Sequence, residues 1–489
     1  MRRFADSLIF SILILQSYIC LLSANPKIAI IGGGIGGASA SHYLNELFHG
    51  ELNMDLFEAK ELGGRLATVE VAGTEYESGG SIIHDKNLLM RHFVKLLGME
   101  ERPSCGDQKF AIWNKDEFVF EESSWTVMTV GRLIFRYSLQ PFRLHSHVNS
   151  VLEDFSKIYQ LHDQGIAFKN VTALLSALNV EFPKMLQIST QEYLTKAGFS
   201  PRLINELVEA TLVVNYGQNT NVQSFVGCVS VAGAGADLWS VKGGNKDVPK
   251  HLIYRNSKVN VVPSIVKKIV HIPRKNNSPI YEVHYINNGS SDVIKSIYDI
   301  VIIAVPLTAD HKMAIEFKDF PKNVNLEFPG SYQTTIVTFV HGDLQRKYFN
   351  LDDSIDAILS CNPNKTIISS VGNLVSVDGK CSRVWKIFSR EPLEQSFINE
   401  MFTNIENKNI INWKAYPKYE RNNPRLDFKL YESLYHVNAI EWAASAMEMS
   451  AIGGRNVAIL AYNEYMRSHL PKESLDVPKY EKLQSSEDL

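Results

Sequence analysis

The chain has 489 residues, of which 45% are hydrophobic and 21% are charged, and its formal net charge is −3. A chain of this length can bury a large core and is expected to fold as two or more domains. Because it has no strongly basic balance and no block of basic residues, its composition gives no indication of a nucleic-acid partner.

The first two dozen residues have the pattern of a secretory signal. Arg2 and Arg3 precede a mostly apolar run of 15 residues, 8–22, and the small residues Ser23 and Ala24 follow. A helix needs about 20 apolar residues to span a bilayer, so this run is short for an anchor. We therefore expect residues 1–24 to be a cleaved signal peptide, with an uncleaved anchor as the alternative, and no transmembrane span in the mature chain.

Sequons are consistent with export. The acceptor pattern for N-glycosylation occurs at Asn170, Asn288 and Asn364. One such pattern arises easily by chance, but several behind a signal peptide favour real modification. These three asparagines are therefore the candidate glycosylation sites.

The cysteines leave two interpretations open. Cleavage of the signal would leave Cys105, Cys228, Cys361 and Cys381, which is too few in so long a chain for a disulfide scaffold. Cys361 and Cys381 flank a predicted hairpin and could pair in an oxidising compartment. They could equally be free buried thiols.

The stretch IAIIGGGIGGASASHYL, residues 28–44, predicts a strand that enters a glycine turn and then a helix. Gly32, Gly34 and Gly37 have the spacing of a dinucleotide-binding turn, in which bare backbone approaches a pyrophosphate at a helix N-terminus. We expect a helix over 38–47 and a second strand over 54–57. Glu58 follows that strand, 21 residues after Gly37, where a carboxylate binds the ribose hydroxyls of an adenosine. The unit therefore predicts a nucleotide site.

Two further glycine pairs favour FAD over a nicotinamide cofactor. Gly63 and Gly64 precede Arg65, which predicts a second backbone-exposed turn beside a permanent cation. Gly79 and Gly80 form a third turn that allows a bulky planar ligand to meet bare backbone. A nicotinamide site does not require these turns, whereas the long pyrophosphate and ribityl chain of FAD suits them.

Later elements indicate a discontinuous nucleotide domain. Ser200 and Pro201 predict the start of a helix that runs to Val214, because serine is a favoured cap and proline a favoured first residue. Strand patterns occur at 281–285, 300–305, 332–340 and 383–388. From residue 471 the chain is polar and is expected to form a mobile tail. Because strands recur far from the first unit, we expect substrate-domain segments to be inserted between segments of the nucleotide domain.

The series of glycine turns is similar to that of the flavin amine oxidase and desaturase superfamily. Within it, the chain resembles the prenylcysteine oxidase family, also called prenylcysteine lyase. The matching blocks extend from about residue 27 to about residue 470. They read IAIIGGGIGGASASHYL, LFEAKELGGRLATVEVAGTEYESGGSIIH, VVNYGQNTNVQSFVGCVSVAGAGADLWSVKGGN and MSAIGGRNVAILAYN.

The resemblance implies an α/β fold of the amine oxidase type. A Rossmann-type FAD-binding domain would be assembled from the discontinuous segments 26–105, 226–308 and 425–470. An α+β substrate-binding domain would comprise 106–225 and 309–424. The FAD would be noncovalent, because no cysteine follows Cys381 to attach it near the C-terminal block.

The resemblance also implies further cofactor contacts. The strand at 258–262 would approach the adenine through its backbone near Val259. Gly453 and Gly454 would lie at a helix start whose N-terminus faces the flavin ring. Glu441 would correspond to an acid that contacts the ribityl chain, although its spacing differs.

The implied reaction is the oxidation of a thioether. Flavin would take a hydride from the prenyl carbon bonded to sulfur in S-farnesyl- or S-geranylgeranyl-L-cysteine. Water would add, the adduct would collapse to a prenyl aldehyde and free cysteine, and oxygen would reoxidise the flavin with formation of hydrogen peroxide. The implied location is the lysosome, reached by the secretory pathway, with secretion as a further destination.

This chemistry requires positioning more than acid or base residues, and we expect no metal. The one catalytic candidate is His84, which closes the GGSIIH block and could assist the attack of water or hold the substrate carboxylate; the alternative is a packing histidine. The prenyl chain needs an apolar tunnel, which the helical middle could line, although core packing explains the same residues. The candidates are Phe199, Leu203, Leu207, Val213 and Tyr216.

Two other functions remain as alternatives. One is a flavin amine oxidase or desaturase with another lipophilic substrate, and the other is a non-catalytic secreted protein that associates with lipid or lipoproteins. Under the leading hypothesis the partners are prenylcysteine, oxygen and water, with peripheral membrane or lipoprotein association and no nucleic acid.

Overall fold

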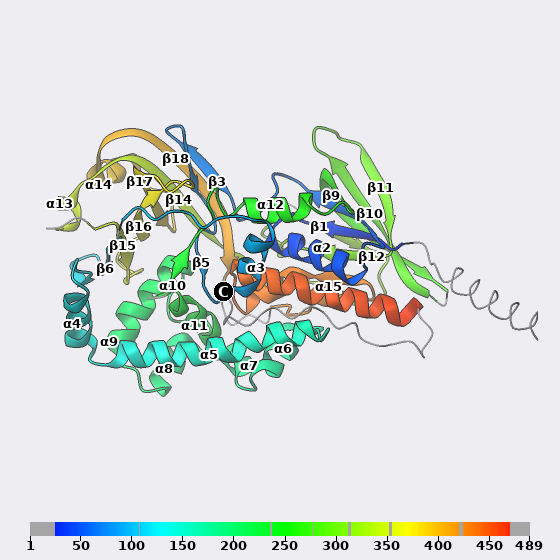
Figure 1. Ribbon diagram of the computed structural model, residues 1–489, viewed down its shortest axis with the longest axis horizontal. Helices are drawn as coiled ribbons and strands as arrows, with labels where there is room; N and C mark the ends of the chain where they lie inside the picture. Colours follow the sequence, from blue (N-terminus) through cyan, green and yellow to red (C-terminus); the bar gives the residue numbers. More distant parts are fainter. Residues whose placement is uncertain are drawn as a thin grey trace, which may run out of the picture.

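The computed structural model describes residues 25–469, apart from residues 107, 235–236, 276, 312–313, 352–354 and 420–423. The predicted signal peptide, 1–24, and the predicted tail, 471–489, lie outside the described residues. Figure 1 shows a nine-stranded sheet on the right, a seven-stranded sheet at the upper left and a layer of helices at the lower left.

The predicted strand–helix–strand unit is confirmed. It consists of β1 (Lys27–Ile31), α2 (Ile35–Leu47) and β2 (Asn53–Glu58), and β1 pairs with β2 in parallel. The helix begins earlier than expected, at Ile35, because Gly34 in extended conformation already serves as its N-cap. The strand residues Ile28 and Ile30 are fully buried, as expected for a central strand of a parallel sheet.

The nine-stranded sheet gathers strands from three separate parts of the chain. Its five central strands run parallel, so their carboxyl ends share the edge that carries the glycine turn. One face packs against α2, α3 (Leu88–Leu96), α12 (Asp247–Tyr254) and α15 (Met447–His469). Besides β1 and β2, the sheet contains β11 (Val293–Tyr298), β10 (Asn277–Asn287), β9 (Val259–Arg274), β12 (Ile300–Ile303), β20 (Leu434–His436), β19 (Lys429–Tyr431) and β13 (Glu316–Lys318).

The seven-stranded sheet is covered on both faces. Neighbouring residues of one strand, Ala111 and Ile112, belong to different apolar clusters because side chains alternate across a sheet. One face packs on α13 (Arg346–Phe349) and α14 (Gln395–Met401), the other on α10 (Glu209–Tyr216) and the hairpin β3–β4 (Thr68–Val71, Thr74–Glu77). The strand order is β18 (Phe402–Pro417), β14 (Tyr332–Leu344), β17 (Cys381–Ser389), β16 (Ile368–Val375), β15 (Ala357–Ser360), β6 (Phe110–Trp113) and β7 (Phe118–Glu121).

The helix predicted from Ser200 is confirmed and contains a π-helical turn. The Ser200 hydroxyl oxygen accepts the backbone N–H of Leu203 at 3.3 Å, and the helix ends at Gly217 in a left-handed conformation. No helix in the described part of the chain is long and apolar enough to cross a membrane. The layer comprises α4 (Thr126–Tyr137), α5 (Gln140–Asp163), α6 (Val171–Leu178), α7 (Phe182–Met185), α8 (Thr190–Lys196), α9 (Pro201–Leu203), η1 (Ile204–Val208), α10 and α11 (Ser224–Ala232).

The expected domain boundaries differ from the structure at two places. The strand β13 lies after the boundary expected at residue 308, yet it pairs with β9 of the nine-stranded sheet. The helix α11 crosses the boundary expected at 225–226 and packs on α5 and α8. Both elements are short, and neither carries a sequence pattern that assigns it to one domain, so tertiary contacts decide their place.

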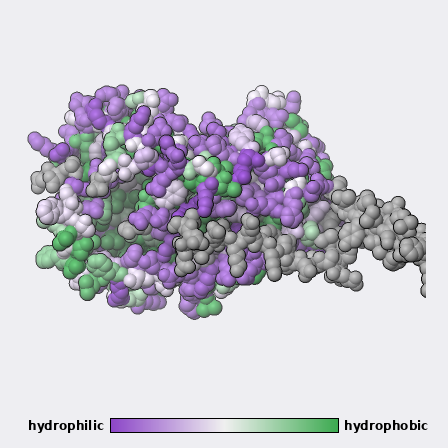
Figure 2. All heavy atoms as spheres, viewed as in Figure 1, coloured by the Kyte–Doolittle hydropathy of each residue, from purple (hydrophilic) through white to green (hydrophobic). Residues whose placement is uncertain are grey.

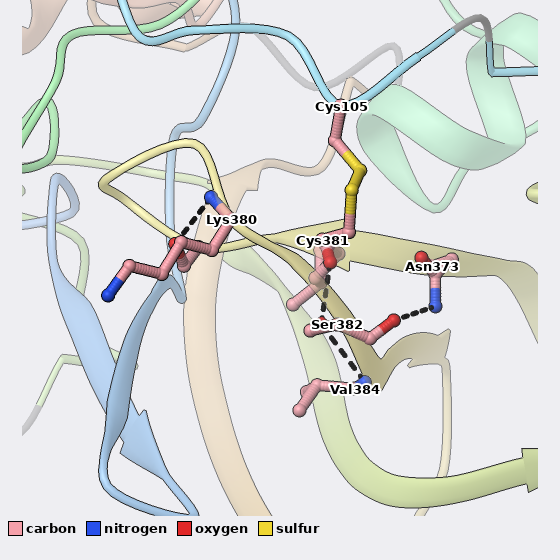
Figure 3. The surroundings of a disulfide bond; sticks show 8 residues. Cys105, Asn373, Lys380, Cys381, Ser382 and Val384 are labelled. Carbon is pink, nitrogen blue, oxygen red and sulfur yellow. Dashed lines mark hydrogen bonds between the residues drawn. A yellow bond between two sulfur atoms is a disulfide. The ribbon is translucent and has the colours of Figure 1, made fainter.

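A disulfide joins Cys105 to Cys381 (Figure 3), with 5.5 Å between the Cα atoms. The possible pairing of Cys361 with Cys381 is therefore wrong, and Cys361 is a free buried thiol. The physical reason is that Cys361 follows β15 and Cys381 begins β17, and β16 lies between those two strands. The hydroxyl of Ser382 further fixes this strand end by donating to the Leu374 carbonyl at 2.7 Å.

Candidate functional site

The structure brings the first two glycine turns together. The backbone N–H of Gly63 donates to the carbonyl of Gly33 at 2.9 Å, and Gly34 and Gly63 form an isolated parallel bridge. A Cβ added to Gly34 would have the Gly63 carbonyl oxygen at 3.7 Å and the Gly64 Cα at 4.0 Å as its nearest neighbours. Two stretches of bare backbone thus face each other, which is the arrangement that a phosphate-bearing ligand requires.

The N-terminus of α2 is open to an anion. No side chain caps it, and its first turn contains no acidic residue. The helix can lie this close to β1 because Gly37 has no side chain: a Cβ there would be 2.0 Å from the carbonyl oxygen of Gly32. This distance explains why close packing of the helix on the strand requires glycine at position 37. The unpaired N–H groups at the N-terminus of α2 are donors of the kind that bind a phosphate.

Glu58 fixes the glycine turn from the end of β2. One carboxylate oxygen accepts the backbone N–H of Gly33 at 2.8 Å, and the other accepts that of Lys60 at 2.9 Å. The acid is therefore at the carboxyl end of the strand beside the turn, as its spacing predicted. A contact with ribose hydroxyls stays a prediction.

The third glycine turn lies against the second. The backbone N–H of Gly80 donates to the carbonyl of Arg65 at 3.0 Å, and a Cβ on Gly79 would be 1.9 Å from that same oxygen. A Cβ on Gly80 would come within 3.8 Å of Met447, the first residue of α15. All three glycine turns and the N-terminus of α15 therefore occupy one region.

Gly453 and Gly454 lie inside α15, so their expected place at a helix start is wrong. A Cβ on Gly454 would be 2.3 Å from the Gly36 carbonyl oxygen, and one on Gly453 would be 3.0 Å from that of Val437. The pair allows α15 to pack closely against α2 and the preceding 3-10 helix η2 (Val437–Trp442). Helix–helix packing thus explains these glycines, and a direct cofactor contact stays a prediction.

Arg65 is held by a carboxylate that comes from the far end of the sequence. Its guanidinium donates to both carboxylate oxygens of Glu441, and the distance to Oε2 is 2.9 Å. It also donates to the carbonyl of Ala415 at 2.9 Å. Glu441 is 1% exposed and also accepts the hydroxyl of Tyr332 at 2.9 Å and the amide of Asn438 at 2.7 Å. Both carboxylate oxygens are therefore engaged by protein groups, and Glu441 is the counter-ion of Arg65; its expected contact with a ribityl chain stays a prediction.

The charge state of this pair follows from the same contacts. Burial alone would raise the pKa of Glu441, but the Arg65 guanidinium and the hydrogen bonds from Tyr332 and Asn438 hold it below its usual value. Burial likewise opposes the charge of Arg65, whereas Glu441 raises its pKa. The pair is ionised and ties the second glycine turn to the β14–β18 side of the seven-stranded sheet.

Two buried titratable residues, Glu77 and Lys386, lie beside the third glycine turn, and the sequence analysis did not predict this position for them. Glu77 accepts the backbone N–H of Asn245 at 2.7 Å through Oε1, and its Oε2 has no hydrogen-bond partner among the described residues. Burial raises the pKa of Glu77 to about 7. Lys386 on β17 donates to the carbonyl of Glu77 at 3.1 Å, and burial lowers its pKa to about 8. Nothing in its local sequence distinguishes Lys386 from a surface lysine, so only the fold reveals it.

His84 lies on β5 (Ile83–His84), which pairs with β8 (Leu238–Trp239). Its Nδ1 accepts the backbone N–H of Lys86 at 2.9 Å, so the neutral ring carries its proton on Nε2. Burial, followed by the charge of Lys86, lowers the pKa of His84. These contacts fix a local turn and favour the packing alternative, while a catalytic role stays a prediction.

The proposed tunnel residues belong to the core. Phe199, Leu203 and Tyr216 are buried in the main apolar cluster, and the ring of Tyr216 packs edge-on against Tyr416 and Tyr419. A cavity of about 670 Å³ is lined by Tyr419 and by Gly217, the residue that follows Tyr216. Most of its lining residues have polar side chains, but polar and apolar atoms share its surface about equally, so it is not the apolar tunnel expected for a prenyl chain. The lining residues include Gln218, Asn219, Asn221, Asn364, Arg390 and Tyr419.

The remaining predicted residues are placed as follows. Val259 begins β9 opposite Met54 of β2, and β9 lies between β2 and β10 in the sheet; its expected contact with an adenine stays a prediction. Asn288 and Asn364 are exposed, and Asn170 caps α6 by accepting the N–H of Ala173 at 2.8 Å, which leaves its amide nitrogen outside that bond. Within the described ranges no group of three or more candidate metal ligands occurs.

Comparison with solved structures shows the fold. Putrescine oxidase in complex with putrescine matches 89% of this chain and 98% of its own length with a TM-score of 0.56, at 13% sequence identity. A family model described as NAD(P)-binding Rossmann-like domain matches residues 30–97. The discontinuous α/β arrangement therefore has the fold of putrescine oxidase.

Comparison with protein sequences shows the family. Prenylcysteine oxidase 1 of Homo sapiens is 40% identical over 91% of this chain and 90% of its own, and that of Mus musculus is 38% identical over 95% and 96%. The human protein named prenylcysteine oxidase 1-like is 34% identical over 90% of both chains. The family model described as prenylcysteine lyase matches residues 120–473. The chain belongs to the prenylcysteine lyase family.

Proposed function

We propose that the protein is an FAD-dependent oxidoreductase that cleaves S-prenyl-L-cysteine to a prenyl aldehyde, free cysteine and hydrogen peroxide, with oxygen and water as co-substrates. The observation that carries the proposal is the meeting of three glycine turns at the N-termini of α2 and α15 in a chain of this family. Relatives named prenylcysteine oxidase 1, which cover nine tenths of the chain or more, support the choice of substrate.

The residues of the site fit FAD. The N-terminus of α2 is uncapped, and the residues beside it, Gly34 and Gly64, have no side chain that would cover the helix end against a pyrophosphate. Glu58 stands at the carboxyl end of the neighbouring strand, where the ribose of the adenosine would bind. Glu77 Oε2 is a buried oxygen without a hydrogen-bond partner in the described part of the chain, and a hydroxyl or N–H of a bound group would satisfy it.

Bound FAD supplies the two-electron acceptor, and the side chains supply position and charge. The Arg65–Glu441 pair fixes the second glycine turn against the sheet that carries Tyr332. Lys386 fixes the third turn through the carbonyl of Glu77. Burial lowers the pKa of Lys386 to about 8, so its positive charge at this turn is less strongly held than that of a surface lysine.

The polar cavity suits the amino-acid end of the substrate. Its wall contains Arg390 and Tyr419, and the hydroxyl of Tyr419 donates to the backbone carbonyl of Glu441 at 3.0 Å. A zwitterionic cysteine moiety needs such polar partners, whereas the prenyl chain needs apolar ones. We assign the cavity to the cysteine end only.

The proposed location is the lysosome, reached through the secretory pathway, with secretion as a further destination. The Cys105–Cys381 disulfide supports an oxidising compartment. The exposed asparagine of the Asn288 sequon supports glycosylation in that pathway, whereas Asn364 lines the cavity assigned to the cysteine end. Peripheral membrane or lipoprotein association would bring the protein to its lipophilic substrate.

The test compares the amounts of the three products of the proposed reaction. Purified protein loaded with FAD is incubated with S-farnesyl- or S-geranylgeranyl-L-cysteine, and peroxide, prenyl aldehyde and free cysteine are followed together. We expect the three products in equal amounts. Peroxide with a lipophilic amine but not with prenylcysteine would favour an amine oxidase, and a colourless protein that binds no FAD would favour a non-catalytic lipid carrier. A yellow protein that forms none of the products from prenylcysteine contradicts the proposal.

A further inference from the structure

The outer side of α4 and the turn that leads into α5 carries large hydrophobic side chains that the core does not cover. Phe135 is 95% exposed, Val127 84% and Trp125 74%. Figure 2 shows hydrophobic residues gathered at the left end of the molecule, where Figure 1 places α4. We call this surface the α4 patch, and it consists of Trp125, Val127, Met128, Ile134, Phe135 and Leu139.

The α4 helix packs on the protein through Leu133 and Tyr137 and leaves a second apolar side exposed. Tyr137, the one buried residue of this fully described helix, donates its hydroxyl to Glu206 at 2.9 Å. Arg136 donates to the other oxygen of Glu206 at 2.7 Å, and Arg132 to the carbonyl of Glu121 at 2.7 Å. A surface helix normally buries its apolar stripe in the core. On α4 a further apolar side stays uncovered, which indicates that this side contacts something outside the described chain.

Within α4 and the start of α5 the charges are of one sign, whereas acidic residues flank this segment at Glu121, Glu122, Glu153 and Asp154. Residues 123–152 include Arg132, Arg136 and Arg143 and contain no aspartate or glutamate, although the whole chain has a net charge of −3. Arg136 is neutralised by Glu206. Arg132 and Arg143 instead donate to the backbone carbonyls of Glu121 and Ala197. Their positive charges therefore remain available to an anionic surface.

We propose that the α4 patch is a docking surface for an anionic lipid bilayer, with α4 lying in the plane of the headgroups. An amphipathic helix with exposed tryptophan and phenylalanine, flanked by arginine, has the composition that binds there without spanning. Figure 2 shows a recess with hydrophobic residues at its wall beside the patch, between the helical layer and the seven-stranded sheet. Delivery of substrate through this face rests on the proposed function, whereas the membrane contact rests on the surface alone.

A second copy of the chain is the other apolar partner to consider. In a two-fold contact the same patch would lie on both sides. Arg132 and Arg143 of each copy would then approach their equivalents with no carboxylate from residues 123–152 to compensate them. The charge pattern therefore favours an anionic lipid surface over self-association.

The experiment measures binding of the FAD-loaded protein to vesicles by flotation, using phosphatidylcholine alone and phosphatidylcholine with phosphatidylserine. The test variant is Trp125→Ser with Phe135→Ser. The matched control is Val180→Ser with Tyr254→Ser, because these residues are also exposed, 73% and 63%, but lie on other elements. Removing two aromatic side chains from the bilayer interface should weaken binding roughly 100-fold, and the control should bind like the unaltered protein. Arg132→Gln with Arg143→Gln should abolish the preference for phosphatidylserine.

Every outcome decides the proposal. Unchanged binding by the Trp125→Ser, Phe135→Ser variant overturns it, as does an unaltered protein that does not bind vesicles. An unaltered protein that is dimeric, and becomes monomeric in this variant, assigns the patch to self-association instead. Turnover of detergent-dispersed S-farnesyl-L-cysteine should be the same in all variants. If the unaltered protein binds vesicles but does not turn over detergent-dispersed S-farnesyl-L-cysteine, the result contradicts the proposed function and does not contradict the docking surface.

Discussion

The nucleotide side and the substrate side of the site are specified in different ways. On the nucleotide side, three glycine turns and Glu58 all lie within residues 32–80 and contact one another through backbone atoms. On the substrate side, Glu441 and Lys386 reach the same turns from strands and helices more than 300 residues away in sequence. Local chain geometry thus determines the first side, and tertiary folding determines the second.

This difference predicts which substitutions affect cofactor binding alone and which lower the stability of the whole fold. Backbone cradles depend on the absence of a side chain, so adding one excludes the ligand without removing a stabilising contact. The side-chain pairs join the two sheets, so removing one partner leaves a buried charge and lowers the stability of the fold. Flavin occupancy and unfolding free energy therefore report separately on the two sides.

The largest effect is expected at Gly34. In Gly34→Val the branched side chain would enter the space between the α2 N-terminus and the second glycine turn, where a pyrophosphate would bind. We expect loss of bound flavin, measured as visible absorbance per mole of folded protein. The matched control is Gly372→Val on β16, where an added Cβ meets nothing within 4 Å. Full flavin occupancy in Gly34→Val would show that the phosphates bind elsewhere.

The next largest effect is expected at the contact between the two sides. Glu441→Gln would leave Arg65 without its buried counter-ion and should lower the free energy of unfolding by about 3 kcal/mol, measured in denaturant. The control Glu75→Gln removes the partner of Lys246 in an exposed pair and should cost at most about 1 kcal/mol. Equal losses in the two variants would contradict the view that Glu441 joins the two sides.

The same division explains what the sequence could predict. The βαβ unit, the glycine turns and the Ser200 helix cap were predictable because each depends on neighbouring residues. The position of Gly453 inside α15 was not, because a glycine pair that allows helix packing has the same sequence as one at a helix start. Lys386 and the partner of Arg65 were not predictable either. Both depend on which strands lie side by side, and no local pattern records that.

The pairing of Cys105 offers a smaller test of the same division, since it ties the segment before β6 to β17 across 276 residues. Cys105→Ser with Cys381→Ser should lower the free energy of unfolding by about 2–4 kcal/mol, because the unfolded chain loses its cross-link. Flavin occupancy should not change, since neither cysteine belongs to a glycine turn. A reductant should destabilise the unaltered protein and Cys361→Ala but not the double variant. If Cys361→Ala alone removes the sensitivity to reductant, the pairing is wrong.

The smallest effect concerns pH at the start of α15. Glu448 accepts the backbone N–H groups of Leu89 at 2.7 Å and Met90 at 3.0 Å and the hydroxyl of Tyr159 at 2.8 Å, so it joins α15 to α3 and α5. Burial raises the pKa of Glu448 from 4.5 to about 7, and these hydrogen bonds offset it only in part. The folded protein therefore holds this proton at a higher pH than the unfolded chain. The contribution to stability is fully present below about pH 4.5 and is lost as the pH rises to about 7.

Glu448→Gln removes that titration, so the variant and the unaltered protein should differ in how stability changes with pH. At low pH the variant should be the less stable of the two, because an amide cannot replace all three contacts of the acid. Between pH 4.5 and 7 the difference should shift in favour of the variant by roughly 1–3 kcal/mol, in unfolding measured at several pH values. A control at Glu100→Gln, on an exposed carboxylate paired with Lys242, should show no such upward shift. If the difference in unfolding free energy between Glu448→Gln and the unaltered protein stays constant between pH 4.5 and 7, the carboxylate is ionised throughout this range. The start of α15 would then carry a negative charge beside the third glycine turn.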